Sequence, residues 1–136
     1  MAAVPRSKHS QSRYLNVIAN IFGTIWIGFG VNAMLRPRAA FAIFEFDLPS
    51  SAADQKLVES LMIIYGARDL FMGLATYFTA WFGTRKACGW TLIAGAGVAG
   101  VDGLVSLQQI GGGQWNHWGY APMIFVVGAL LAGVWD

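Results

Sequence analysis

The stretch YLNVIANIFGTIWIGFGVNAML, residues 14–35, decides the fold of this chain. It contains no charged side chain, and a helix of this length can cross roughly 30 Å of hydrocarbon. A cleaved secretory signal would have a shorter apolar core followed by small residues at a cleavage site. The stretch therefore predicts a helix that stays in the membrane after synthesis.

The composition of the whole chain agrees with this prediction. Hydrophobic residues make up 56% of the 136 residues and charged residues only 12%, whereas soluble domains carry about 25% charged residues. A soluble core of this size cannot hide so much apolar surface. The net charge of +2 is too small to indicate nucleic acid as a partner. We therefore expect an all-α integral membrane four-helix bundle, with the lipid bilayer as its partner.

The other hydrophobic stretches complete a four-span domain. Proline after Arg36 ends the first span, because proline breaks a helix. Ser51 with Asp54 resembles a capping box, so the second helix should begin before the membrane. Between them, the alternating Phe44–Leu48 segment has a period of two and predicts an extended segment lying on the membrane surface. The expected boundaries are a polar tail at 1–13 and a membrane domain at 14–135, with spans at 14–35, 57–82, 87–107 and 118–135.

Basic residues in the connections set the expected orientation. One side of the membrane receives Arg6, Lys8, Arg13, Arg85 and Lys86, and the other side receives Arg36, Arg38 and Lys56. This bias places both termini in the cytoplasm. We expect a multi-pass membrane location, in the endoplasmic reticulum if the cell is eukaryotic, and a homo-oligomer stays an open alternative.

Three charged residues lie inside the predicted spans. Arg68 and Asp69 fall at the centre of the second span and Asp102 inside the third. Each would cost roughly 2.5–3.5 kcal/mol if it faced lipid, so they should face the bundle interior and pair. Tyr65 should lie at the level of Asp102, and the Arg68 side chain should lean back towards both.

More polar groups belong to the same half of the membrane. Asn32 ends the first span, Glu59 begins the second helix and His117 precedes the fourth span. They predict a polar pocket with Arg68 and Asp69 as its floor. We expect no metal and no cofactor, because the chain has one cysteine and no Cys/His cluster. The predicted site comprises Tyr65, Arg68, Asp69, Asp102 and His117 as catalytic residues, and Asn32 and Glu59 as substrate-binding residues.

A purely structural interpretation of these residues is open as well. One arginine and one aspartate can act as an ion pair that fixes two helices without any chemistry. However, two aspartates face a single arginine, and paired carboxyl groups in different environments can serve as acid and base. Either aspartate can take either role. Glu59 at the membrane surface has the alternative of being simply solvated, and His117 the alternative of being an interface residue.

The segment Tyr65–Gly73, followed by Asp102-Gly103 and His117, resembles an uncharacterised family of small four-span membrane proteins found in fungi and bacteria. The resemblance covers about residues 14–135. Fungal members of this type occur in natural-product gene clusters. Some, including those of aurovertin-like polyketide pathways, are considered epoxide-opening hydrolases or cyclases. The resemblance implies that this chain has such an activity in polyketide or terpenoid biosynthesis.

The chemistry has a separate analogy. Limonene-type epoxide hydrolases use an Asp–Arg–Asp set, to which Asp102, Arg68 and Asp69 would correspond. Those enzymes are soluble and differently folded, so the analogy concerns chemistry alone. The leading hypothesis is a membrane-embedded enzyme that opens an epoxide, or otherwise acts by acid–base catalysis, on a lipophilic small molecule. A proton-linked transporter that oligomerises and a non-catalytic accessory protein are the alternatives.

Overall fold

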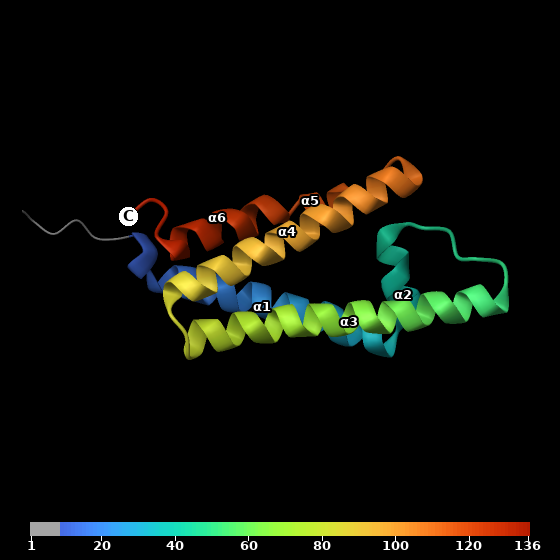
Figure 1. Ribbon diagram of the computed structural model, residues 1–136, viewed down its shortest axis with the longest axis horizontal. Coiled ribbons are helices and arrows are strands. Elements are labelled where there is room, and N and C mark those ends of the chain that lie inside the picture. The colour runs from blue at the N-terminus through green and yellow to red at the C-terminus, as the bar shows by residue number, and fades with distance from the viewer. Residues whose placement is uncertain (1–8) are drawn as a thin grey trace, which may run out of the picture.

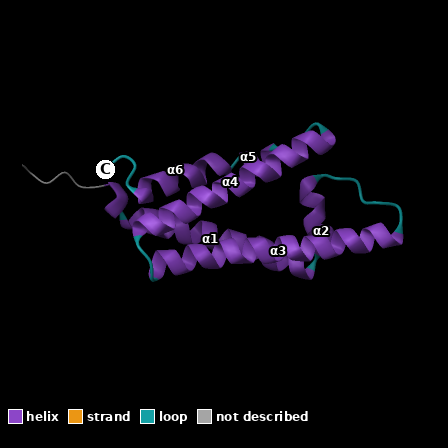
Figure 2. Ribbon diagram, in the orientation of Figure 1, coloured by secondary structure: helices purple, strands orange, loops and turns teal. Residues whose placement is uncertain are grey.

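The computed structural model describes residues 9–136, and this part of the chain is helical, without strands (Figures 1 and 2). Arg6 and Lys8, used above for the orientation, lie outside the described residues with the rest of 1–8. The expected all-α class is confirmed. The helices are α1 (Arg13–Leu35), α2 (Pro37–Phe41), α3 (Ala52–Trp81), α4 (Arg85–Ile110), α5 (Trp115–Trp118) and α6 (Ala121–Ala132), with short 3-10 helices η1 (His9–Gln11) and η2 (Ala42–Phe44).

The long helices form two pairs, α1 with α3 and α4 with α6 (Figure 1). A short turn after Trp81 joins α3 to α4, and these two helices diverge towards the end of the molecule where α2 lies. At the opposite end, the backbone N–H of Ser10 donates to Asp136 Oδ1 at 3.0 Å. The first described residues and the last residue therefore lie at the same end of the bundle.

Glycines bring the backbones within each pair into contact. A Cβ atom on Gly30 would lie 2.6 Å from the carbonyl oxygen of Gly66, and one on Gly73 would lie 2.6 Å from that of Gly23. Between α4 and α6, a Cβ atom on Gly89 would lie 2.5 Å from a carbonyl oxygen of the partner helix. These distances leave no room for side chains, so each pair is closely packed.

Two further glycines of α4 accept tryptophan rings in place of a helix backbone. A Cβ atom on Gly95 would lie 2.5 Å from the ring of Trp26, which comes from α1. A Cβ atom on Gly103 would lie 2.2 Å from the indole nitrogen of Trp118, which comes from α5. The face of α4 with these two glycines therefore fixes α1 and α5 through their indole rings.

The connection between α1 and α3 differs from the expected extended segment at its start, over Phe44 and Glu45. Pro37 ends α1 but also occupies the first turn of α2, where its fixed φ and missing N–H favour helix initiation. Phe44 closes η2, and Glu45 follows with a left-handed φ of 59°. The capping prediction is supported by the structure, because the Asp54 N–H donates to Ser51 Oγ at 3.1 Å.

The helix boundaries also refine the predicted spans. Helix α3 begins at Ala52 and is 30 residues long. The region of the fourth predicted span is not one continuous helix, because α5 ends at Trp118 and α6, of 12 residues, begins at Ala121. By length and composition, α1 and α4 are the described helices that could cross a membrane.

Candidate functional site

Arg68, whose side chain is half-buried, is the centre of an ionic cluster with two buried aspartates between α3 and α4. Its Nη1 and Nη2 atoms donate to Oδ1 and Oδ2 of Asp102, each at 3.0 Å. The same guanidinium donates to Oδ1 of Asp69, from Nε at 3.3 Å and from Nη2 at 3.0 Å. Both aspartates that we predicted as partners of Arg68 therefore contact it, and the fork to Asp102 joins the two helices.

Tyr65 completes the cluster. Its ring lies 3.9 Å from the guanidinium carbon of Arg68, a cation–π distance, and its hydroxyl donates to Asp102 Oδ2 at 3.4 Å. The side chains of Asp69 and Asp102 are 5% and 11% exposed. Two buried carboxyl groups share one guanidinium, so the cluster carries a surplus acidic group.

The two aspartates have different surroundings. Both carboxylate oxygens of Asp102 accept hydrogen bonds from Arg68, and its backbone carbonyl accepts one from the Ser106 hydroxyl at 3.1 Å. Asp69 contacts Arg68 through Oδ1 and lines a cavity that Asp102 does not line. Asp69 is therefore the carboxyl group that can contact a ligand in the cavity, while Asp102 holds Arg68 in place through its two hydrogen bonds.

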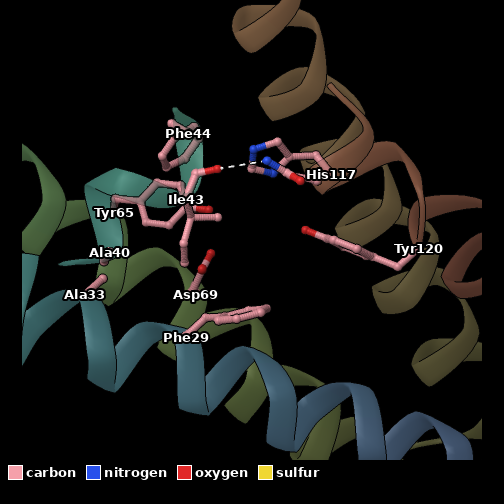
Figure 3. Close-up of a pocket in the computed structure, with 10 residues that line it drawn as sticks. Phe29, Ala33, Ala40, Ile43, Phe44, Tyr65, Asp69, His117 and Tyr120 are labelled. Atoms are coloured by element: carbon pink, nitrogen blue, oxygen red, sulfur yellow. Dashed lines mark hydrogen bonds between the residues drawn. The ribbon is translucent and has the colours of Figure 1, made fainter. Parts of the chain in front are cut away.

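The cavity lies between the diverging ends of the two helix pairs. Its empty volume is about 390 Å³, including the part open to the outside, and its enclosed part has room for a few water molecules. Figure 3 shows the Asp69 carboxyl group pointing into it from α3. The lining is mostly aromatic and apolar, from Phe29, Ala33, Ala40, Ile43, Phe44, Tyr65, Asp69, Asn116, His117 and Tyr120.

His117 is the second ionisable group of the cavity. It is 2% exposed, and its ring lies 5.0 Å from that of Phe44, centroid to centroid. Among the described residues neither ring nitrogen has a hydrogen-bond partner. Burial lowers the pKa of this imidazole below its usual value, so the neutral form is favoured. A neutral imidazole offers one donor and one acceptor.

The neighbours of His117 in sequence hold it at the cavity. The Trp118 indole packs against Gly103 and donates from Nε1 to the carbonyl oxygen of Gly100 at 3.0 Å. The Asn116 amide donates to the carbonyl oxygen of Ile43 at 3.2 Å and to Glu45 Oε1 at 3.1 Å. Helix α5 is thus fixed to α4 on one side and to η2 on the other.

Tyr120 is a cavity residue that the sequence analysis missed. Its side chain points into the cavity from the start of α6, as Figure 3 shows. It lies three residues after His117, and positions three apart share a face where the chain is helical. That spacing was the available signal. Phe44 was also missed as a cavity residue, because the segment around it was expected to be extended.

Two predicted substrate-binding residues are not at the cavity. Glu59 pairs with Arg38 on the surface, where the two side chains are 30% and 63% exposed. Asn32 is partly exposed on α1, and its carbonyl accepts the Arg36 N–H at 2.7 Å. Neither residue lines the cavity. The other five predicted residues, Tyr65, Arg68, Asp69, Asp102 and His117, do lie together.

Fold and site together define a small helical protein with a buried arginine–aspartate cluster beside an aromatic cavity. The described residues contain no group of three or more His, Cys, Asp or Glu side chains that could hold a metal ion. The chain belongs to the family described as domain of unknown function (DUF4267), whose model matches residues 23–131. No curated protein and no solved structure matches the chain.

Proposed function

We propose that this protein is a membrane-embedded enzyme that acts on a lipophilic small molecule by general acid–base catalysis. The observation that carries the proposal is the position of Asp69, a 3%-exposed acidic residue at the wall of an aromatic cavity. A buried ionisable group in such a cavity is typical of a functional site. The surplus of acidic over basic groups in the cluster supports a role beyond a simple ion pair.

Apolar side chains on the outside of the molecule support the membrane location. Large apolar residues are exposed on every long helix, for example Ile25 at 45%, Phe71 at 70%, Val101 at 59% and Phe125 at 49%. Soluble monomers rarely leave apolar patches of this extent uncovered. A lipid environment would cover them, and it would also supply a lipophilic substrate directly to the cavity.

Epoxide opening is the most concrete version of the proposed reaction. Asp69 takes the proton of the attacking water or internal hydroxyl as its oxygen forms a new bond to an epoxide carbon. The bond from that carbon to the ring oxygen breaks, the opened oxygen takes up a proton from water, and Asp69 then gives its proton to water, so that no net proton is consumed. Arg68 is the positioning residue of Asp69, and Asp102 keeps the guanidinium in place through its two-point contact.

The test compares metabolites in the source organism after deletion of the gene and its restoration as wild type, Asp69→Asn or Glu59→Gln. We expect an epoxide precursor to accumulate in the deletion and in Asp69→Asn, and to be cleared by wild type and Glu59→Gln. Growth in ¹⁸O-labelled water separates the two reactions, because hydrolysis incorporates the label and cyclisation does not. Full restoration by Asp69→Asn would overturn the catalytic role of this residue.

The fork between Arg68 and Asp102 favours one alternative, a structural clamp between α3 and α4 in a non-catalytic accessory protein. The double variant Arg68→Asp with Asp102→Arg separates the two functions. A clamp tolerates this exchange, since the pair re-forms in the opposite direction. The enzyme does not, because Asp69 then lies beside a carboxylate and has lost its guanidinium.

A further inference from the structure

His117 and Tyr120 form a second polar wall of the cavity, apart from the ionic cluster. Both come from the segment between α4 and α6, while Asp69 comes from α3. In Figure 3 the Tyr120 hydroxyl and the imidazole of His117 face the cavity from the side across from Asp69. The lining between the two walls is mainly aromatic and aliphatic.

The buried imidazole of His117 points to a ligand. A buried polar atom without a hydrogen bond costs roughly 1–3 kcal/mol, so proteins rarely keep one without a reason. Here both ring nitrogens lack a partner among the described residues, although the side chain is only 2% exposed. A ligand oxygen in the cavity would satisfy such a nitrogen.

From this geometry we infer that the cavity binds a lipophilic molecule with two oxygen functions. One is a hydroxyl group that donates a hydrogen bond to Asp69, and the other is an acceptor oxygen that receives hydrogen bonds from His117 and Tyr120. Asp69 provides carboxyl oxygens for the hydroxyl. Tyr120 has an O–H donor and neutral His117 an N–H donor for the acceptor oxygen, which can be an epoxide, ether or carbonyl oxygen. The aromatic side chains contact the carbon skeleton between them.

This inference rests on the proposed function and narrows it to one substrate class. The hydroxyl bound at Asp69 is the nucleophile, and the acceptor oxygen is the one bonded to the electrophilic carbon. When the nucleophile belongs to the substrate itself, the product is a ring. A hydroxy-epoxide is therefore the substrate class, and cyclisation is the reaction.

Binding of four matched aromatic probes to the purified full-length protein in detergent tests the inference. The probes are ethylbenzene, 4-ethylphenol, acetophenone and 4-hydroxyacetophenone, which carry neither oxygen, the hydroxyl, the carbonyl or both. We expect 4-hydroxyacetophenone to bind about tenfold more tightly than either single-oxygen probe, in line with the net value of one hydrogen bond. Equal affinity for all four probes, or no binding by any, would overturn the inference.

Variants assign the effect to the two walls. Tyr120→Phe should remove most of the advantage of carbonyl-bearing probes and leave 4-ethylphenol unaffected. Tyr77→Phe is the matched control, because Tyr77 contacts Thr24 at 2.6 Å and does not line the cavity. An equal loss in both variants, or no loss in Tyr120→Phe, contradicts the assignment. Circular dichroism shows whether each variant keeps its helices.

Histidine NMR gives an independent readout. The chain has two histidines, so protein labelled with ¹³C at histidine Cε1 should give two signals, and exposed His9 serves as the reference. Carbonyl-bearing probes should shift the His117 signal and leave His9 unchanged, while ethylbenzene should shift it much less. If these probes behave as expected but no precursor accumulates in the gene deletion, the binding site stands and the proposed enzyme fails. If clearance of the precursor depends on Asp69 but the four probes bind equally, the proposed enzyme stands and the two-oxygen binding site fails.

Discussion

Two arginine–carboxylate pairs of this protein have opposite surroundings. Arg38 and Glu59 pair on the surface, with side chains 63% and 30% exposed. Arg68 and Asp102 pair between helices, where the guanidinium is 34% and the carboxylate 11% exposed and a second, buried aspartate shares the guanidinium. Both pairs join residues far apart in sequence, but they differ in solvent access and in the number of charges.

This difference determines what each pair can do. Water and salt screen the surface pair, so its contribution to stability is small. The buried pair is screened much less, and breaking it leaves carboxylates without a partner. The pair between the helices places an additional acid, Asp69, at the wall of the aromatic cavity, whereas the surface pair lines an open hollow without a further acid. This difference is the reason that Glu59, although charged and at the expected depth, is not a residue of the cavity.

The largest expected effect comes from removing the half-buried cation, Arg68. Arg68→Gln should lower the free energy of unfolding by at most about 3 kcal/mol, the low end of the range for a buried pair, because the guanidinium is 34% exposed. The loss arises because Asp69 and Asp102 then face each other without a guanidinium. Unfolding of the purified protein in detergent, followed by circular dichroism, measures it. A loss below about 1 kcal/mol would mean that water reaches the cluster and that it resembles the surface pair.

Substitution of Gly103, the residue after Asp102, tests the cavity wall without removing the ion pair. Gly103→Ala should destabilise by about 1–3 kcal/mol, because the new Cβ overlaps the Trp118 indole and displaces α5 with His117. The His117 NMR signal should shift, while Arg68 keeps its contacts.

Gly97→Ala on the same helix is the matched control. Nothing lies within 4 Å of a Cβ atom there, so alanine should stabilise by up to about 1 kcal/mol through helix propensity. Equal effects of Gly97→Ala and Gly103→Ala would show that Trp118 does not depend on the small residue.

The helices and the ionic cluster could be predicted from sequence because single strong signals encode them. Charged residues within apolar stretches pair with one another inside the bundle, so Arg68, Asp69 and Asp102 were predicted to lie together. Ser51 could be recognised as a cap because its hydrogen bond is local. The cavity wall could not be predicted in full, because Phe44 and Tyr120 reach it through the packing of α2, η2 and α5, which no local pattern encodes.

The two misplaced residues show the limit of estimating position from depth. Glu59 and Asn32 were assigned to the pocket because they lie in the same half of the predicted spans as His117. Depth fixes a position along the helix axis but not around it, and Glu59 faces outwards to Arg38. Pro37 shows a related ambiguity, since proline is compatible with both the end of one helix and the start of the next.

The smallest expected effect belongs to the surface pair. Glu59→Gln should change the free energy of unfolding by less than about 1 kcal/mol, because its partner Arg38 is already largely solvated. The same unfolding experiment at low and high salt measures it, and wild type and variant should converge at high salt, where surface charges are screened. A loss as large as that of Arg68→Gln, unaffected by salt, would mean that the hollow around Arg36–Ala39 and Glu59 is covered in the native environment. Both pairs would then be shielded from water, and they would differ only in that a second aspartate shares Arg68.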